Sequence, residues 1–328
     1  MARIKIAQIG IGHDHAEFIL RSIVKQTDTF EFVGLFVPEQ ETEIFADKLQ
    51  IPIFRDAHLL TLQEILEDES IVAVAIESRE QDLSTYAIQC AKAKKQIHLD
   101  KPGSLDIENF EKLVSICKTN ETVLHMGYMY RYNPVISEAI QKVKSGALGN
   151  VFSVEAQMSV DYDVTKREWL GELRGGMMYF LGCHLIDLIY SLQGEPKEVI
   201  PYKCASGKDG CATKDYSLTL FSYENGMSFA KVCATEKGGF GRRQLVITGT
   251  KGTIEIRPLE EHDVYPNTYT KICEVIESGE KIERRSSGFD RYDGMMKGFA
   301  EIVTGERENQ YTYDYELDLF RLFVRSFS

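Results

Sequence analysis

The stretch RIKIAQIGIGHDHAEFILRSIVKQ, residues 3–26, decides the fold of the N-terminal part of the chain. Residues 3–9 are short, apolar and rich in isoleucine, which favours a buried strand. Residues 16–26 repeat apolar side chains at helical spacing. GIGHDH, residues 10–15, stands between the two. The order is therefore strand, glycine turn and helix, which is the setting of a dinucleotide-binding turn.

The turn departs from the usual pattern at its last position. Gly10 permits the tight turn, and Gly12 lets backbone amides approach a pyrophosphate at the helix N-terminus. A third glycine normally allows close packing of helix on strand, but His15 takes its place. The imidazole must either push the helix outward or point into the cleft, and both possibilities stay open. We count Gly10, Gly12, His13 and His15 as candidate cofactor contacts.

The alternation of strand and helix continues through the first third of the chain. Further strands are expected at 30–36, 71–76, 96–99 and 122–126, with helix-like stretches between them at 41–50, 59–68, 84–95 and 107–120. Right-handed crossovers leave little choice but a parallel sheet covered on both faces. The pattern predicts a doubly wound α/β domain over residues 1–126.

After Asn133-Pro134 the pattern changes. Two helix-like stretches, 135–149 and 177–194, flank a strand at 151–160. Five strands then follow without intervening helices, and Asn225-Gly226 marks a hairpin turn between two of them. Consecutive strands of this kind imply a large, mostly antiparallel open sheet. We therefore expect an α+β domain over residues 127–328; the five strands are 198–206, 216–223, 227–236, 242–249 and 252–258, and two closing helices are 292–304 and 314–327.

Composition points to a small-molecule partner. A chain of 328 residues exceeds the usual size of a single core, so two domains are expected. The net charge of -12 disfavours nucleic acid and anionic membrane surfaces. No apolar run has the length of a membrane span and no signal peptide is apparent, which favours the cytoplasm. The seven cysteines are scattered and never spaced as CxxC, so no disulfide framework or zinc cage is expected.

The end of the second predicted strand bears on the choice of cofactor. Val37 stands where an acidic reader of the ribose hydroxyls usually sits, and Glu39 could serve from the loop two residues later. The loop carries Glu39, Glu41 and Glu43 and has no cation before Lys48, so it would repel a 2′-phosphate. The sequence thus favours NAD over NADP.

Five further motifs, in order along the chain, carry a family resemblance. They are QIHLDKPGS (96–104), GYMYRYNP (127–134), SGALG (145–149), GGMMYFLGCHLID (175–187) and ITGTKGTIEI (247–256). Together they resemble the Gfo/Idh/MocA oxidoreductases, the group of glucose-fructose oxidoreductase and inositol dehydrogenase. The resemblance implies a Rossmann domain, a substrate domain whose open sheet mediates a homodimer or homotetramer, and hydride transfer between a nicotinamide and a hydroxyl or carbonyl group of a sugar or polyol.

The resemblance also implies roles for particular residues. Lys101 matches the lysine that the family places beside nicotinamide and substrate, where an ammonium group stabilises a developing alkoxide. His184 matches the family's acid/base histidine, in the cleft between the domains. Glu77 and Pro102 join the expected cofactor contacts, together with Val37, Glu39 and Lys101. The expected substrate contacts are Tyr128, Tyr130, Arg131, Asp163, Phe180 and Asp187.

One departure from the family pattern leaves two functions open. The family usually has a catalytic aspartate four residues before the histidine, but here the residue is Phe180. On an α-helix, residues 180, 184 and 187 share a face, so Asp187 could orient the ring of His184 instead. Either the protein is a dehydrogenase with altered substrate preference, or it has lost hydride transfer and serves as a regulatory protein that binds a cofactor or sugar.

A metal site at His13, Asp14 and His15 is set aside at this level. Residues i and i+2 point to different sides of a helix. No cysteine or acid cluster lies close enough in sequence to complete a coordination sphere. The sequence therefore predicts no bound metal.

Overall fold

The computed structural model describes residues 3–262 and 267–328, which form two compact units. The first unit comprises the chain up to Met129 together with Tyr292–Phe320, and the second comprises Tyr130–Arg291 and Arg321–Ser328. The expected domains, 1–126 and 127–328, differ from these units chiefly in the assignment of residues 292–320. None of the helices in the described ranges combines the length and apolar character that a bilayer crossing needs.

The first unit is built on a five-stranded parallel sheet, as predicted. Its strand order is β2-β1-β3-β4-β5. The chain therefore adds β2 on one side of β1 and then reverses, adding β3, β4 and β5 on the other side. Ligands of such sheets bind beyond the carboxyl ends of the strands at this switch point. The strands are β1 (Ile4–Ile9), β2 (Phe30–Phe36), β3 (Ala73–Ile76), β4 (Gln96–Leu99) and β5 (Leu124–Met126).

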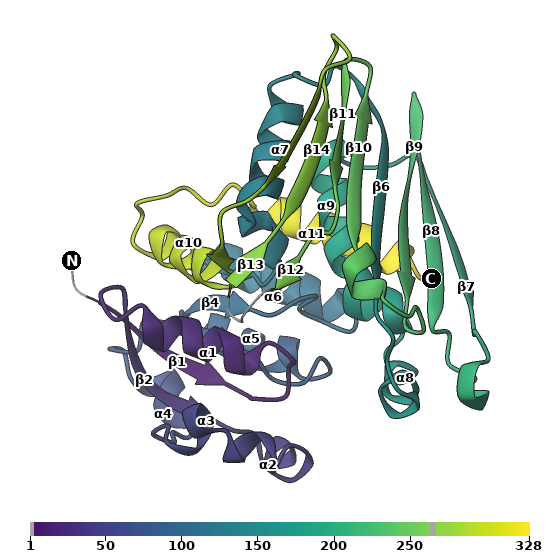
Figure 1. Ribbon diagram of the computed structural model, residues 1–328. Coiled ribbons are helices and arrows are strands. Elements are labelled where there is room, and N and C mark those ends of the chain that lie inside the picture. The colour runs from purple at the N-terminus through teal and green to yellow at the C-terminus, as the bar shows by residue number, and fades with distance from the viewer. Residues whose placement is uncertain (1–2, 263–266) are drawn as a thin grey trace. The chain divides into compact units, whose positions relative to one another are not determined.

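Helices separate these strands along the chain, and Figure 1 shows several of them beside the sheet. The predicted helix at 107–120 is present in full. Two others are shorter than expected, because the loop between β2 and β3 is divided into small pieces. The helices are α1 (Ala16–Lys25), α2 (Glu39–Ile44), α3 (Pro52–Arg55), α4 (Leu62–Glu67), α5 (Leu83–Lys92) and α6 (Ile107–Asn120), with a 3-10 turn at Lys48–Gln50.

The closing helix α10 (Asp293–Val303) completes the core of the first unit. Asp293 accepts a hydrogen bond from the Ser22 hydroxyl of α1 at 2.9 Å. Phe299 lies against the rings of His98 and His125. Farther on, Phe320 of α11 (Tyr313–Arg325) stacks on Phe110 with ring centroids 4.2 Å apart. These buried contacts explain why residues 292–320 belong with the N-terminal strands.

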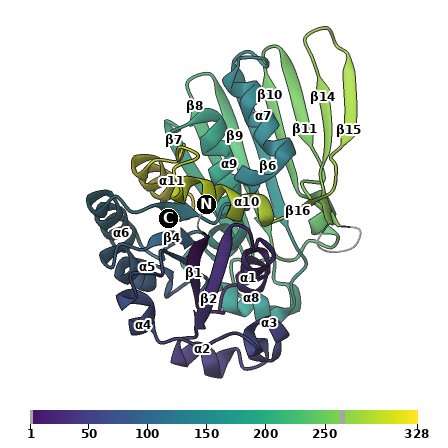
Figure 2. The ribbon, with the colours of Figure 1, turned by 90° about the vertical axis from the view of Figure 1, so that its left-hand side faces the viewer.

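The second unit contains an eight-stranded sheet of order β15-β14-β11-β10-β6-β9-β8-β7. All neighbouring pairs are antiparallel except β6 and β9, so the sheet is mixed but mostly antiparallel, as predicted. Figure 2 shows these strands side by side. They are β6 (Val151–Ser159), β7 (Glu198–Cys204), β8 (Tyr216–Tyr223), β9 (Gly226–Cys233), β10 (Gln244–Gly249), β11 (Gly252–Ile256), β14 (Lys271–Val275) and β15 (Lys281–Arg285).

The hairpin between β8 and β9 lies where the sequence predicts it, but its two turn residues are Glu224 and Asn225, because Gly226 already pairs with Tyr223 at the start of β9. The strands β14 and β15 and a small sheet of β12 (Glu261–His262), β13 (Asn267–Tyr269) and β16 (Phe289–Asp290) were not anticipated. In β8 and β10, buried residues alternate with half-buried ones, so one face of the large sheet is covered and the other is more open.

Helices α7 (Pro134–Lys144) and α9 (Cys183–Gln193) of the second unit lie together beside the sheet, and α9 packs on β6 and β9. The continuous helix expected over 177–194 is in fact two segments. Met178–Gly182 is a π-helix, and only from Cys183 does an α-helix begin. A short helix, α8 (Val164–Leu170), was not predicted.

Candidate functional site

The glycine turn after β1 depends on two residues that lack a side chain. Gly10 has φ +88°, and a Cβ atom there would lie 2.4 Å from Cα of Ser78. A Cβ on Gly12 would lie 2.7 Å from the backbone nitrogen of Arg79. The turn therefore runs against the backbone that follows β3, where larger residues would collide.

The amides of this turn point at a carboxylate from within the protein. Glu41, on α2, is fully buried, and its Oε2 atom accepts hydrogen bonds from the amides of Ile11 and Gly12 at 2.7 and 2.9 Å. Its other oxygen, Oε1, accepts from the amide of Arg79 at 2.8 Å. Burial raises the pKa of Glu41, although the three amides oppose that shift. The turn is thus a binding site for an anion, as a pyrophosphate site requires.

Lys48 also holds this turn in place, through its positively charged side chain. Its ammonium group donates to the carbonyl oxygens of Ile11, Gly12 and His13, at 3.0, 2.9 and 3.1 Å. Glu41 and Lys48 therefore hold the donors and the acceptors of one short loop.

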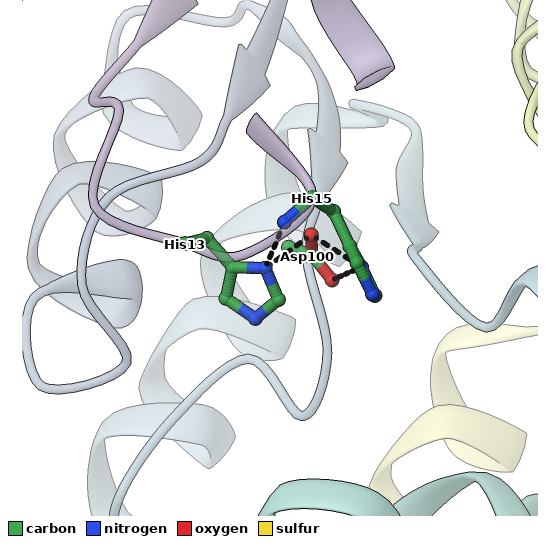
Figure 3. A group of neighbouring side chains, drawn as sticks. All are labelled: His13, His15 and Asp100. Atoms are coloured by element: carbon green, nitrogen blue, oxygen red, sulfur yellow. Dashed lines mark hydrogen bonds and ion pairs between the residues drawn. The ribbon is translucent and has the colours of Figure 1, made fainter. Parts of the chain in front are cut away.

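Two histidines of the turn meet a carboxylate from β4 (Figure 3). Asp100 follows directly after β4, and its Oδ2 atom lies 2.8 Å from Nδ1 of His13 and 3.0 Å from Nδ1 of His15. His15 precedes the first residue of α1, and its ring also lies 5.5 Å from that of Tyr292, measured between centroids. The imidazole of His15 thus points toward the segment after β4 and the residue before α10. This answers the question of its direction, which the sequence left open.

The electrostatics of this cluster separate its members. Burial by itself would raise the pKa of Asp100, but the imidazoles of His13 and His15 hold it well below its usual range. Burial lowers the pKa of His15 to about 4, so this ring is neutral near pH 7. Burial, and then the charge of Asp100, raise the pKa of Glu77 well above its usual range. Asp100 is therefore held ionised, whereas Glu77 keeps its proton to a higher pH than an ordinary glutamate does.

Lys101 is buried immediately after Asp100, on the same segment that follows β4. Its backbone amide donates to Oδ1 of Asp100 at 2.6 Å, and the peptide bond to Pro102 is cis. Lys101, Glu77 and the two histidines of the turn thus come together in the first unit, at the carboxyl ends of β1, β3 and β4.

The two candidate ribose contacts lie apart from this cluster. Val37 packs against the apolar cluster that contains Ile11, Leu35 and Phe54. Glu39, the first residue of α2, is exposed. Of the glutamates at 39, 41 and 43, only Glu41 is buried, because its carboxylate binds the glycine turn. The exposed acidic side chains of this segment are Glu39 and Glu43.

In the second unit, His184 lies on α9 and is buried. The ring of Tyr130 meets it edge-on, with centroids 5.3 Å apart and planes at 84°. The hydroxyl of Tyr130 donates to Oε2 of Glu260 at 2.9 Å. Arg243 and Arg291 also bind Glu260, and these cations hold its pKa below the usual range against the effect of burial. Tyr130 therefore links His184 to a buried charge cluster.

Asp187 does not take the partner that the sequence suggested. Its Oδ1 atom accepts two hydrogen bonds from Arg131, from Nε at 2.9 Å and from Nη2 at 2.7 Å. Both side chains are buried. No hydrogen bond between Asp187 and His184 occurs among residues 3–262 and 267–328. The pair instead fixes the segment that precedes α7 to α9.

Phe180 lies in the π-helix, so the α-helical spacing that placed it on one face with His184 does not apply. Its ring meets Trp169 edge-on at 5.3 Å, and the ammonium of Lys166 lies 4.6 Å from its centroid. Asp163 caps α8 by accepting from the amide of Lys166 at 2.8 Å. Tyr128, in the first unit, is buried.

Sequence reasoning missed Glu41, Lys48 and Asp100 as parts of the site. Glu41 stands among three similar glutamates, and no local pattern distinguishes the buried one. Asp100 entered the sequence analysis only as part of the motif QIHLDKPGS, with no role of its own. The helical spacing that set a metal site aside does not apply, because His13 and His15 precede α1, and Asp100 joins them from 85 residues beyond His15 in the sequence.

Two family models together match most of the chain. Residues 4–128 match "Oxidoreductase family, NAD-binding Rossmann fold", and residues 136–255 match "GFO/IDH/MocA C-terminal domain". The two matches fall in the order in which the structure presents its parallel and its mixed sheet.

Individual relatives are distant. An uncharacterised oxidoreductase of Escherichia coli is 24% identical over 197 residues, 60% of this chain and 55% of that protein. Myo-inositol 2-dehydrogenase of Thermotoga maritima is 24% identical over 200 residues, 60% of this chain and 57% of that protein. The matched part thus spans little more than half the length of these relatives. An inositol dehydrogenase homologue of Azotobacter vinelandii, solved with NADH and myo-inositol, shares the fold with a TM-score of 0.77 at 16% identity, over 98% of this chain and 94% of that one.

Proposed function

The chain belongs to the Gfo/Idh/MocA family of oxidoreductases, with an NAD-binding Rossmann domain and the family's C-terminal domain, and on this basis we propose that it is an NAD-dependent dehydrogenase. Its substrate would be a sugar, polyol or related compound, oxidised at a hydroxyl or reduced at a carbonyl group. The names of the relatives, which include inositol dehydrogenases, support this substrate class.

The observation that carries the proposal is the position of Lys101. The residue is buried beyond the end of β4, in the same unit as the glycine turn and among the groups that surround it. This is the switch-point edge of the sheet, where dinucleotides bind in open α/β folds. A buried ammonium there would stabilise negative charge that develops on a substrate oxygen.

The other roles follow from the chemistry of each residue. The dinucleotide would supply or accept the hydride, and its pyrophosphate would be held by the amides of Ile11 and Gly12 after Glu41 leaves them. His184 would exchange a proton with the reacting hydroxyl. Glu39 is exposed at the start of α2, where it would accept hydrogen bonds from ribose hydroxyls and disfavour a 2′-phosphate. Tyr128, Tyr130 and Arg131 remain proposed substrate contacts.

A second candidate is a binding protein that no longer transfers hydride. Two observations favour it. Phe180 occupies an aromatic environment where the family pattern expects an aspartate. The anion site of the glycine turn is filled by Glu41. In this alternative the fold would bind a cofactor or sugar and report its presence without turnover.

We also propose that the protein works in the cytoplasm as a homodimer or homotetramer. The open face of the large sheet supports this proposal, because β8 and β10 leave a row of half-buried side chains there. Uncovered apolar sheet faces commonly mark such interfaces.

Titration with NADH, followed by nicotinamide fluorescence, tests the cofactor, and a panel of sugars and inositols tests turnover. Lys101→Ala should keep NADH binding and lose about a hundredfold or more in rate, the usual contribution of a positioned polar group. Lys92→Ala, an exposed lysine of α5, is the matched control and should change neither. Failure to bind NADH at millimolar concentration rules out the dehydrogenase. Binding without turnover on the whole panel favours the binding protein.

A further inference from the structure

Three side chains at the carboxyl ends of β1 and β4 form a set with no proposed role in the chemical step, although two of them are expected cofactor contacts. His13, His15 and Asp100 each offer one ligand atom, and these atoms lie within 4.8 Å of one another. We propose that these three residues form a binding site for a divalent transition-metal ion. The inference is independent of the proposed dehydrogenase activity, because it rests on these ligands alone.

The arrangement resembles a coordination sphere before the ion enters. Nδ1 of His13 and Nδ1 of His15 both face Oδ2 of Asp100, at 2.8 and 3.0 Å, as Figure 3 shows. Zinc binds imidazole nitrogen and carboxylate oxygen at about 2.0–2.2 Å, which places tetrahedral ligand atoms roughly 3.3 Å apart. Small movements of the two rings would therefore suffice to admit the ion.

The chemistry of the three ligands favours a cation over protons. Nδ1 of each imidazole lies next to Oδ2 of Asp100, and Nδ1 of His13 also accepts a hydrogen bond from the amide of His15 at 3.2 Å. One divalent ion bound between them would neutralise Asp100 and bind a ring nitrogen of each histidine at the same time. Two nitrogens and one oxygen suit zinc or a neighbouring first-row metal, and leave positions open for water or substrate.

An independent observation lies on the far side of His13. Metal-bound histidines usually direct their second ring nitrogen to a carboxylate, which orients the ring. Nε2 of His13 faces Oε1 of Glu80 at 3.7 Å, and both residues are buried. This nitrogen has no hydrogen-bond partner among residues 3–262 and 267–328. Glu80 would thus orient the ring of His13, and His13 would bind the proposed ion through its other ring nitrogen.

The backbone around the two histidines is already held in place. Lys48 binds the carbonyl of His13 and of the two residues before it, and Gly12 lies against the backbone of Arg79. Asp100 is placed by pairing of β4 with β3. Because each ligand stands on a fixed segment, little ordering remains to be done when the ion binds.

The test uses the full-length protein, stripped with EDTA and titrated with Zn²⁺ by calorimetry in the absence of dinucleotide. We expect one strong site per chain, and Co²⁺ at the same site should give the visible absorption bands of a low-coordinate complex. Asp100→Asn and His15→Ala should each weaken Zn²⁺ binding by more than the tenfold to roughly hundredfold that outer-shell changes cause. His58→Ala, at an exposed histidine of the same unit, should leave binding unchanged.

Glu80→Gln gives a graded check, with a loss of about tenfold if the carboxylate orients His13. Because buried substitutions can impair folding, crystals of the unmodified protein soaked in Zn²⁺ provide a second measurement. An anomalous peak bounded by His13, His15 and Asp100 supports the site. Absence of strong binding, equal affinity in the Asp100→Asn variant, or a peak elsewhere overturns the proposal. A chain that binds Zn²⁺ but not NADH would retain the metal site and lose the dehydrogenase assignment.

Discussion

The Oε2 atom of Glu41 lies 2.7 Å from the amide nitrogen of Ile11, within the turn that the family uses for its dinucleotide. The same oxygen accepts from Gly12, so one internal carboxylate uses the donors that a pyrophosphate needs. An incoming pyrophosphate must therefore compete with a residue of the protein itself, and the Glu41 carboxylate must leave these amides for it to bind.

Removing this competitor should strengthen cofactor binding. In Glu41→Ala the amides are free for the pyrophosphate, and hydrogen bonds to a charged group are worth about 1.5–3 kcal/mol each, so NADH should bind roughly tenfold more tightly or better. The same change should lower the free energy of unfolding, because buried amides lose their acceptor. Fluorescence titration and urea unfolding measure the two effects. Glu43→Ala, exposed on the same helix, is the control. Weaker NADH binding in the variant would show that Glu41 is a cofactor ligand rather than a competitor.

The same carboxylate should make cofactor affinity depend on pH. The pKa of Glu41 is raised by burial, so the group gains its proton at a higher pH than an ordinary glutamate. Between about pH 8 and about pH 5 the protonated fraction rises, and a neutral Glu41 holds the amides less strongly. The ratio of NADH affinity in the unmodified protein to that in Glu41→Gln should therefore rise as pH falls. A constant ratio would contradict this.

Glu77 should make the protein less stable as pH rises. Its pKa in the folded state is raised well above the unfolded value of about 4.3, first by burial and then by Asp100. Such a group favours folding fully below the unfolded pKa and loses that contribution as pH rises through the folded pKa, at about 1.4 kcal/mol per pH unit. Urea unfolding at about pH 5 and about pH 8 should show Glu77→Gln gaining stability relative to the unmodified protein. Glu69→Gln, an exposed change, should show no such trend.

The ion pair of Arg131 and Asp187 should affect the stability of the fold more than it affects activity. Asp187→Asn leaves a buried guanidinium without its counter-charge, which typically costs about 3–5 kcal/mol of unfolding free energy. Arg131→Met combined with Asp187→Leu should recover much of this loss, because the buried charges are then removed together. Urea unfolding of Arg131→Met, of Asp187→Leu and of the double variant measures the coupling energy between the two side chains. If Asp187→Asn keeps its stability but raises KM for a substrate of the panel, the pair is part of the substrate site.

The open sheet face should carry the subunit contact. Phe229 of β9 is half-buried there and pairs across the strands with Leu220 and Glu155. Phe229→Glu should shift the protein toward the monomer, as measured by light scattering over a range of concentrations. Lys281→Glu, a charge change on the edge strand β15, is the control and should keep the assembly. A monomeric unmodified protein would refute the proposal.

The elements with strong local patterns were predictable from the sequence. The strand 30–36 has the expected bounds, and the expected hairpin forms beside Asn225, because both depend on neighbouring residues only. The π-helix at Met178–Gly182 was missed, since an apolar stretch looks the same at either helical spacing. The assignment of residues 292–320 was missed because periodicity gives the type of an element and not its partner.

The site was predictable in outline only. The order of motifs pointed to Lys101 and to the glycine turn, and both lie at the expected edge of the first sheet. The contacts of Asp100 with His13 and His15 join residues far apart in sequence, and only the pairing of β1 with β3 and of β3 with β4 brings them together. Such contacts are set by tertiary structure, so a single sequence leaves them undetermined.

The helix α10 has a consequence for synthesis of the chain. Phe299 packs on His98 and His125, and Phe320 packs on Phe110, so the first unit lacks part of its core until residue 320 has been made. All of the large mixed sheet is encoded in between. During synthesis, the N-terminal strands therefore remain incompletely packed until the whole second sheet has been synthesised. A fragment that ends at Met129 would lack these contacts, so completion of the first unit depends on residues that follow the whole second sheet in the sequence.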